Sequence, residues 1–515
     1  MIKVIDIRVT PAQHASRAEL RFVIVDHLNL TADFDFRVLK RSIDARPRYP
    51  VYQLRVEVAI DEKLPVSDLA PPLNKDISNG IPVHIVGAGP TGLFAALQCI
   101  EKGLKPILFE RGKTVRDRRR DLALLNRVHL VNPESNYCFG EGGAGTYSDG
   151  KLYTRSDKRG DIKKVLHQLI QFGADPEIRI DSHPHIGTNK LPKVIENIRN
   201  YIISCGGIVH FESKLTDFFI EDKNIKSIVI NDEQEHDVQH LLLATGHSAR
   251  DIFQLLDRKK IAIENKPFAL GVRIEHPQSL INSIQYRKGS QDPHLPPASY
   301  NLVTQTDRKA VYSFCMCPGG IIAPCATAPG EVVTNGWSPS KRNNPFANSG
   351  IVIPVDESDW MIYQKEFGNL AALEFQKRVE IAAWKVGGKT QAAPAQRLVD
   401  FMEDNISERL PKTSYQPGIQ SADLRTVLPD KFSTALKKGF KDFVKKMPAY
   451  HSQEAVLHAT ESRTSSPVKI PRDPTAMNHP DLKNFYPCGE GAGYAGGIMS
   501  AAIDGVKVIE TIANL

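Results

Sequence analysis

A glycine-rich turn early in the chain constrains its fold more than any other feature of the sequence. Gly87, Gly89 and Gly92 match the pattern G-x-G-x-x-G, directly after a short apolar strand expected over 84–86, and a helix is expected over 91–102. In a β-α-β unit with this pattern, the first glycine allows a tight turn and the second lets the backbone approach a pyrophosphate. The third lets the helix pack closely against the strand. The turn therefore predicts a dinucleotide-binding fold.

The residues around this turn fit the same role. The helix that follows would aim backbone N–H groups and the positive end of its dipole at the phosphates. Pro90 and Thr91 begin that helix, and Pro90 presets its first turn. Glu110 ends the next expected strand, 23 residues after Gly87, where a carboxylate would hydrogen-bond a ribose diol. Arg111, beside it, is a further candidate contact for the cofactor.

A second glycine-rich segment, NYCFGEGGAGTYSDGKL, spans residues 136–152. It repeats the G-x-G-x-x-G spacing, but no full strand precedes it and polar residues follow, so it does not predict a second nucleotide fold. Closely spaced glycines allow the backbone to lie against a flat ligand. A mobile surface loop is the alternative. The candidate cofactor contacts here are Gly142, Gly143, Ala144, Gly145 and Thr146.

Two later turns complete the predicted cofactor site. Ala244, Thr245 and Gly246 end a buried strand, as at the last strand of a flavoprotein core. Near the carboxyl end, YPCGEGAGYAGGI places a glycine turn after a strand and before a helix, which suits the pyrimidine end of an isoalloxazine and the ribityl chain. Its candidate contacts are Gly489, Glu490, Gly496, Gly497 and Ile498. Two glycine clamps about 400 residues apart favour FAD, because a fold that binds only NAD has no use for the second.

With these motifs the chain resembles a family of FAD-dependent dehydrogenases of bacteria and plastids, within the wider glutathione-reductase-like group of FAD/NAD(P)-binding flavoproteins. The matching segments are KRSIDAR (40–46), GAGPTG (87–92), FGEGGAGTYSDGKL (139–152), FCMCPGG (314–320), TNGWS (334–338), ANSG (347–350), ESRTSSPV (461–468) and GEGAGYAGGI (489–498). The resemblance implies FAD bound through the two glycine motifs and Glu110, and an N-terminal ferredoxin-like domain. It implies no particular substrate. Trp337 departs from the smaller residue expected at its position, which bears on the shape of the local pocket.

The patterns along the chain predict an α/β protein with an interrupted core. A small α+β domain is expected over residues 1–70, and a linker over 71–80. A doubly wound, Rossmann-like FAD-binding domain is expected to begin over 81–267 and to be completed by 481–515, with an inserted α+β substrate or cap domain over 268–480.

Three residues are candidates for the reaction centre. Arg463, in a loop with hydroxyl residues, suits a carboxylate or carbonyl substrate or the flavin N1–C2 region, although a purely structural pair with Glu461 explains it equally well. His458 is the candidate proton donor. Lys151 could pair with the flavin or a phosphate, or be exposed.

The cysteines near the expected substrate pocket allow a second interpretation. Cys315 and Cys317 lie two apart on an expected strand and would point to the same side. Two packed thiols are favoured over a redox pair, because flavin disulfide reductases use other spacings. No cluster has the ligands of a metal site.

Composition and charge exclude several classes of protein. Of the 515 residues, 41% are hydrophobic and 24% charged, which is ordinary for globular domains and unlike disordered chains, collagen or coiled coils. No apolar run approaches the roughly 18 residues of a membrane helix, and the start of the chain lacks the pattern of a signal peptide. Seven cysteines are too few for a disulfide scaffold. These features predict a cytoplasmic protein with reduced thiols and no membrane partner.

Three basic clusters, within 37–48, 111–120 and 437–446, could contact phosphate groups or nucleic acid. In the third, Leu436, Phe440 and Phe443 recur at helical spacing, so its lysines are better explained as the solvated face of an amphipathic helix.

The function that fits best is an FAD-dependent oxidoreductase that moves a hydride between the flavin and a small-molecule substrate. NADH or NADPH is a candidate transient hydride donor, although no second dinucleotide fold is expected. An RNA-modifying flavoprotein that binds tRNA through the basic patches is the main alternative. A flavin-bound scaffold without catalysis is a third reading.

Overall fold

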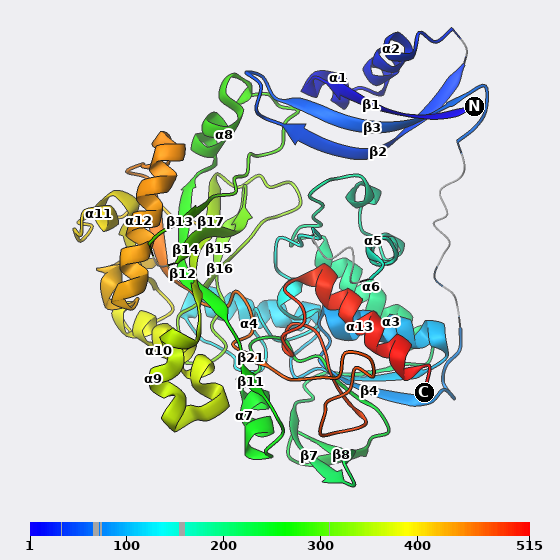
Figure 1. Cartoon of the computed structure of the whole chain (residues 1–515), viewed down its shortest axis with the longest axis vertical. Helices are drawn as coiled ribbons and strands as arrows, with labels where there is room; N and C mark the ends of the chain where they lie inside the picture. Colours follow the sequence, from blue (N-terminus) through cyan, green and yellow to red (C-terminus); the bar gives the residue numbers. More distant parts are fainter. Residues whose placement is uncertain (32, 65–71, 73–74, 154–159, 308) are drawn as a thin grey trace.

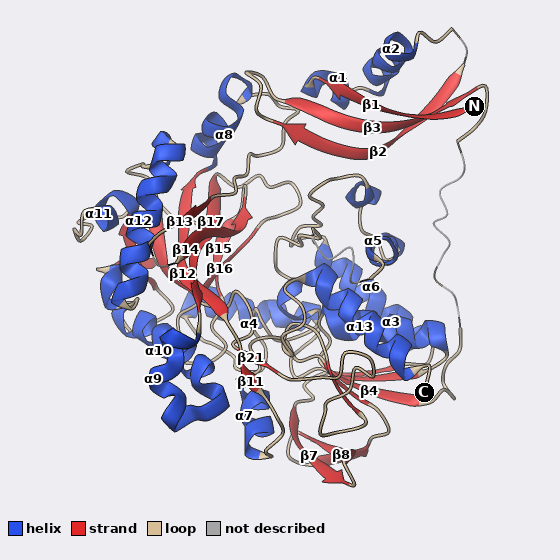
Figure 2. Ribbon diagram, in the orientation of Figure 1, coloured by secondary structure: helices blue, strands red, loops and turns tan. Residues whose placement is uncertain are grey.

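The computed structural model describes residues 1–31, 33–64, 72, 75–153, 160–307 and 309–515. Three sheets organise them: a small N-terminal sheet, a parallel sheet and a large mixed sheet (Figures 1 and 2). None of the described helices has both the length and the apolar character needed to cross a bilayer.

The N-terminal sheet has the order β1-β3-β2 and is antiparallel throughout. Two helices pack on it, and Leu20 and Ile24 fill the space between. The elements are β1 (Ile2–Val9), α1 (Pro11–Ala15), α2 (Arg17–Leu28), β2 (Phe34–Asp44) and β3 (Val51–Ile60). Among the described residues this is a β-α-α-β-β arrangement, which lacks the second helix and the fourth strand of the expected ferredoxin-like unit.

The parallel sheet joins three distant parts of the chain, in the order β22-β10-β4-β5-β6. The carboxyl-terminal strand β22 lies at one edge of this sheet, because β10 pairs in parallel with both β4 and β22. The strands are β4 (Pro82–Val86), β5 (Lys105–Phe109), β6 (Ile208–His210), β10 (Leu241–Leu243) and β22 (Phe485–Pro487).

The two faces of the parallel sheet are covered differently. One face carries the helices α3 (Pro90–Lys102), α5 (Ile162–Gln171), α6 (Leu191–Ser204) and α13 (Ile498–Ile512). The other face packs against a three-stranded antiparallel sheet and one helix: β7 (Leu215–Glu221), β8 (Asn224–Ile230), β9 (Gln234–Asp237) and α7 (Arg250–Arg258). The fold is therefore α/β with a parallel sheet, but a β-meander stands where a doubly wound fold has its second layer of helices. The buried apolar residues of β7 and β8 account for this, because they pack against the parallel sheet: Leu215, Phe218, Ile225, Ile228 and Ile230.

The large mixed sheet has the order β13-β14-β17-β12-β20-β18-β19, and its helices lie on the side away from the parallel sheet (Figure 1). Its strands are β12 (Phe268–Pro277), β13 (Val303–Gln305), β14 (Ala310–Cys317), β17 (Phe346–Val355), β18 (Ala393–Arg397), β19 (Ile419–Ser421) and β20 (Val456–Glu461). A hairpin, β15 (Ile321–Pro324) and β16 (Thr334–Trp337), and a short ladder, β11 (Glu264–Asn265) and β21 (Val468–Lys469), accompany it. The helices on this sheet are α8 (Gln278–Tyr286), α9 (Glu357–Phe367), α10 (Ala371–Val386), α11 (Leu398–Met402) and α12 (Asp430–Lys446). Helix α4 (Val115–Val128) lies apart from them and contacts the hairpin strand β15.

The amphipathic helix expected around the third basic cluster is confirmed as α12. Leu436, Phe440 and Phe443 are buried in the core of the large sheet. The lysines on its other side are exposed or paired with acidic residues, such as Lys437 with Asp404.

The first glycine turn sets how helix α3 meets strand β4. Helix α3 begins after Gly89 with Pro90 in its first turn and ends at Gly103 in the left-handed conformation. A Cβ on Gly92 would lie 1.9 Å from the Gly87 carbonyl oxygen, which no side chain tolerates. The close packing predicted for this glycine is therefore observed.

We expect Gly92→Ala to lower the free energy of unfolding by about 1–3 kcal/mol, because its methyl group would force the turn and the helix apart. Gly496→Ala is the matched control, since a Cβ there has no neighbour within 4 Å. Urea denaturation of the two variants measures the difference. Equal stability of both variants would contradict this account of the turn.

Candidate functional site

A cavity of about 560 Å³ lies beyond the carboxyl ends of the parallel strands, where ligands bind in open α/β sheets. The turns that follow β4 and β10 line one part of it, and strands β14 and β16 of the large sheet line another. The cavity therefore lies between the nucleotide-binding part of the chain and the expected substrate domain. Its size is within the usual range for small-molecule and cofactor sites.

The three glycine-rich turns meet at this cavity. A Cβ on Gly143 would lie 3.1 Å from the Cα of Gly89, so the two backbones are nearly in contact. A Cβ on Gly145 would lie 3.3 Å from the Ile498 side chain and 3.4 Å from Pro90. Segments separated by about 400 residues in sequence thus meet in one surface, where the glycines leave main chain open to a ligand.

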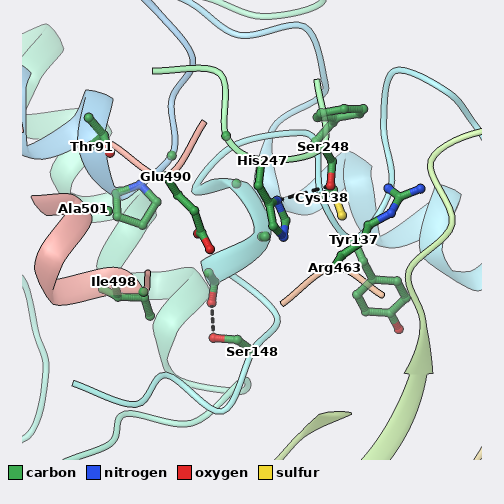
Figure 3. A pocket seen from close by; sticks show the side chains of 18 of the residues that line it. Thr91, Tyr137, Cys138, Ser148, His247, Ser248, Arg463, Glu490, Ile498 and Ala501 are labelled. Carbon is green, nitrogen blue, oxygen red and sulfur yellow. Dashed lines mark hydrogen bonds between the residues drawn. The ribbon is translucent and has the colours of Figure 1, made fainter. Parts of the chain in front are cut away.

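Most of the predicted cofactor residues line the cavity, and four support it from behind. The lining residues are Gly87, Gly89, Pro90, Thr91, Glu110, Arg111, Gly143, Ala144, Gly145, Ala244, Thr245, Gly246, Glu490, Gly496, Gly497 and Ile498. The supporting residues are Gly92, Gly142, Thr146 and Gly489. A Cβ on Gly489, for example, would lie 2.1 Å from the Thr91 hydroxyl oxygen, so this glycine allows close packing of turn and helix. Figure 3 shows Thr91, Glu490, Ile498 and Ala501 on one side of the cavity.

Glu110 is held in place by backbone amides. Its carboxylate accepts hydrogen bonds from the amides of Ala88 at 2.9 Å, Gly112 at 3.0 Å and Gly140 at 2.9 Å. These bonds join the first two glycine segments at the cavity wall. Carboxylate oxygens have further acceptor capacity, so the ribose interaction predicted from the sequence is compatible with this geometry.

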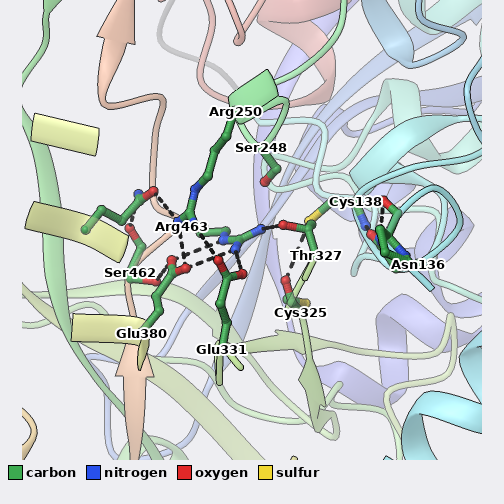
Figure 4. Close-up of polar contacts among 12 residues, drawn as sticks. Asn136, Cys138, Ser248, Arg250, Cys325, Thr327, Glu331, Glu380, Ser462 and Arg463 are labelled. Carbon is green, nitrogen blue, oxygen red and sulfur yellow. Dashed lines mark hydrogen bonds and ion pairs between the residues drawn. The ribbon is translucent and has the colours of Figure 1, made fainter. Parts of the chain in front are cut away.

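Arg463 lines the cavity and belongs to a buried ion-pair network (Figure 4). Its guanidinium donates to Glu331 at 2.8 Å and to Glu380 at 3.0 Å, and Arg250 binds the same two carboxylates. Burial alone would raise the pKa of Glu380, but Arg250 and Arg463 outweigh it and lower the pKa to about 2. The network ties helix α7 to helix α10. Arg463 therefore pairs with Glu331 and Glu380, and not with the neighbouring Glu461 that the sequence suggested.

Lys151 lies at the part of the cavity lined by the large sheet. Its ammonium donates to the Met316 carbonyl and lies 3.6 Å from Asp149, which also pairs with Arg342 at 2.9 Å. Burial would lower the pKa of Lys151, but Cys317, Cys315 and Asp149 outweigh it and raise the pKa. The lysine is therefore a cation at the cavity wall.

His458 is not at the cavity. It lies on β20, fully buried, where its ring contacts the Thr413 hydroxyl at 2.9 Å and the Arg273 carbonyl at 3.2 Å. The sequence placed it near the arginine loop, but along β20 it points into the large sheet. Its position gives it a packing role in place of the expected proton transfer.

The two cysteines on β14 do not point together as alternation predicts. A bulge shifts the register between Phe314 and Cys317, and Cys315 has a positive φ of 46°. Cys315 is exposed and Cys317 is buried, although both contribute to the cavity wall. The irregular backbone explains the failure of the prediction.

Sequence reasoning missed several cavity residues. His247 lines the cavity together with Ser248 and Tyr137 (Figure 3). His247 directly follows the Ala-Thr-Gly strand end, so the usual position of ligand sites beyond parallel strands was the available signal. Tyr137 lies in the second glycine segment, three residues before its first glycine, Gly140, and carried no signal of its own.

Most of the basic residues named as candidates for RNA binding form ion pairs within the protein or are buried. In the first cluster, Arg37 pairs with Glu57, Arg41 with Asp181, and Arg46 with Asp44. In the second, Arg111 pairs with Asp251 and Arg118 is fully buried. These pairs reduce the positive charge that a phosphate backbone would meet.

We expect Glu380→Gln to lower the free energy of unfolding by about 3 kcal/mol, because it leaves two buried guanidiniums with one carboxylate. Glu374→Gln on the same helix is the control, since its partner Arg378 is exposed, and should cost roughly 0.5 kcal/mol or less. Chemical denaturation of both variants measures the two costs. Similar costs would show that the network adds no stability.

His458 predicts a pH dependence of stability. Burial lowers its pKa to about 4, from about 6.5 in an unfolded chain. The unfolded state therefore binds the proton more tightly, and this part of the stability is complete above about pH 6.5 and lost as the pH falls toward 4. His458→Gln should flatten the decline in unfolding free energy between about pH 7 and pH 4.5, whereas His451→Gln at an exposed site should not. An unchanged slope in His458→Gln would refute the assignment.

Comparisons with known proteins place the chain in a family. Residues 267–464 match the family model described as "FAD-dependent protein, C-terminal domain-like", and residues 1–59 match a "Domain of unknown function (DUF8436)". A protein of Clostridium beijerinckii, described as uncharacterized, is 40% identical over 502 residues, which cover 92% of this chain and 91% of the relative.

Solved structures give a weaker likeness. CtdE in complex with FAD aligns at 12% identity with a TM-score of 0.33, over 84% of this chain and 84% of CtdE. The halogenase PltM aligns at 10% identity with a TM-score of 0.36, over 84% of this chain and 68% of PltM. The family model and the Clostridium relative carry the assignment: the chain is an FAD-dependent protein that belongs to the same family as the Clostridium beijerinckii protein.

Proposed function

We propose that the protein is an oxidoreductase that moves a hydride between bound FAD and a small organic substrate, as a dehydrogenase or reductase of the glutathione-reductase-like group. One observation carries the proposal. The cavity lined by the glycine turns is continuous with the part lined by Lys151, Asn335 and Trp337. A cofactor held by the turns would therefore face Lys151 and Asn335 at the wall that the large sheet forms.

In this proposal the cofactor supplies the two-electron chemistry, and the protein supplies binding, orientation and electrostatics. Glu110 and the first turn hold the adenosine diphosphate half, and the turn at 489–498 holds the flavin half. The turn at 142–146 lies between them, with Gly143 against Gly89 and Gly145 against Ile498. Lys151 orients a carbonyl, carboxylate or amine group of the substrate. Its ammonium has three donors; the Met316 carbonyl and the Cys317 sulfur accept from two of them, which leaves one for a substrate.

We further propose that NADH or NADPH reduces the cofactor from the same cavity. The described residues form one parallel nucleotide-binding sheet, so a nicotinamide would enter beside the substrate pocket. The proposal includes a cytoplasmic enzyme with a substrate domain over 268–480 and an N-terminal domain over 1–70.

The proposal is tested by anaerobic mixing of the holoprotein with NADH and NADPH, followed by a panel of small carbonyl, imine and alkene acceptors. We expect one donor to bleach the visible flavin absorbance and one acceptor class to restore it. Lys151→Met should keep its FAD but slow the acceptor step by about 100-fold, the usual size of an acid–base or orienting contribution. Lys193→Met, at an exposed position on α6, is the control.

Two results would contradict the proposal. One is flavin absorbance that no donor in the panel bleaches, as a non-catalytic scaffold would show. The other is an acceptor step in Lys151→Met as fast as in the wild type, which would place the substrate elsewhere.

A further inference from the structure

Arg118 on α4 is fully buried. Among the described residues, its guanidinium donates hydrogen bonds only to uncharged acceptors. Its Nε donates to the Asn136 carbonyl at 2.7 Å, and its two Nη atoms donate to the carbonyls of Tyr137, Glu141 and Gly143 at 2.9 Å each. A fifth hydrogen bond reaches the hydroxyl of Thr146 at 3.2 Å. One side chain therefore holds the whole second glycine segment.

The other two large buried arginines at the domain interface are compensated. Arg273 forms a bidentate pair with Glu461, and Arg463 pairs with two glutamates. No described carboxylate lies within ion-pair distance of Arg118, and Glu110 accepts from three amides instead. Burial lowers the pKa of the Arg118 guanidinium, with Tyr147 and Glu110 opposing this effect. A buried charge without a counter-ion is costly unless a ligand supplies one.

The Gly143–Ala144 peptide connects this charge to the cavity. Its carbonyl accepts from Arg118, and in a trans peptide the N–H of the next residue points the opposite way. The Ala144 amide donates to no acceptor among the described residues, and Ala144 lines the cavity beside the contact of Gly143 with Gly89. Gly89 precedes the N-terminus of α3, where a phosphate would bind.

We propose that Arg118 is a positioning residue for the pyrophosphate of FAD: it fixes the Gly143–Ala144 peptide with its N–H toward the cavity, and the phosphate negative charge compensates the buried guanidinium. The basic residues near Arg118 in the sequence do not share this role. Arg120, two residues further on the same helix, is exposed.

The test compares Arg118→Met, Arg118→Lys and the control Arg120→Met as apoproteins. FAD affinity is measured by quenching of flavin fluorescence, and ADP, which carries the pyrophosphate without the flavin, is measured as a competitor. We expect Arg118→Met to weaken FAD and ADP by the same factor, about 10- to 100-fold, the size of a lost charge-assisted interaction with an anion. Arg118→Lys should lose less because it keeps the charge, and Arg120→Met should lose less than about twofold.

Three results would overturn the proposal. The first is unchanged FAD affinity in Arg118→Met. The second is a loss for FAD that ADP does not share, or no competition by ADP at all, which would place the effect outside the pyrophosphate. The third is an equal loss in Arg118→Lys and Arg118→Met, which would leave the charge without a role. If Arg118→Met does not fold, the comparison of FAD with ADP in Arg118→Lys decides. The test uses no substrate, so its outcome is independent of the proposed hydride transfer.

Discussion

The close approach of backbone at Gly89 and Gly143 is the constraint on which the rest of the site depends. A side chain at Gly143 would press on the Gly89 backbone, because its Cβ would lie 3.1 Å from the Gly89 Cα, and the surface on which a cofactor can lie would be disturbed. The parallel sheet makes this approach possible, because β10 pairs with both β4 and β22 and so brings the early and late parts of the chain to one edge. The cavity is a consequence of that pairing.

Two buried charged side chains then hold the glycine segments in place. Glu110 binds amides from two glycine segments, and Arg118 binds carbonyls from the second. The buried carboxylate thus fixes main chain through its amide groups, and the buried guanidinium fixes neighbouring main chain through its carbonyl groups. On the other wall, the Arg250–Glu380–Arg463 network joins the nucleotide-binding part to the large sheet. The cavity is therefore enclosed by elements that ion pairs hold together.

Local patterns in the sequence were sufficient for the parts of the site that depend on local geometry. Glycine spacing after a strand predicted the turn at Gly87, and helical spacing predicted the buried face of α12. Contacts that depend on tertiary packing could not be predicted this way. The acidic partners of Arg463 are more than 80 residues away in sequence. A bulge at Cys315 interrupts the expected alternation of side chains. His458 points into a sheet whose strand order no local pattern reveals.

The most direct test of the central claim is a crystal structure of the protein with FAD bound. The account predicts a single FAD with its adenosine next to Glu110, its pyrophosphate between Gly89 and Ala144, and its isoalloxazine between the 489–498 turn and Lys151. FAD bound elsewhere, or with its isoalloxazine at Glu110, would contradict it.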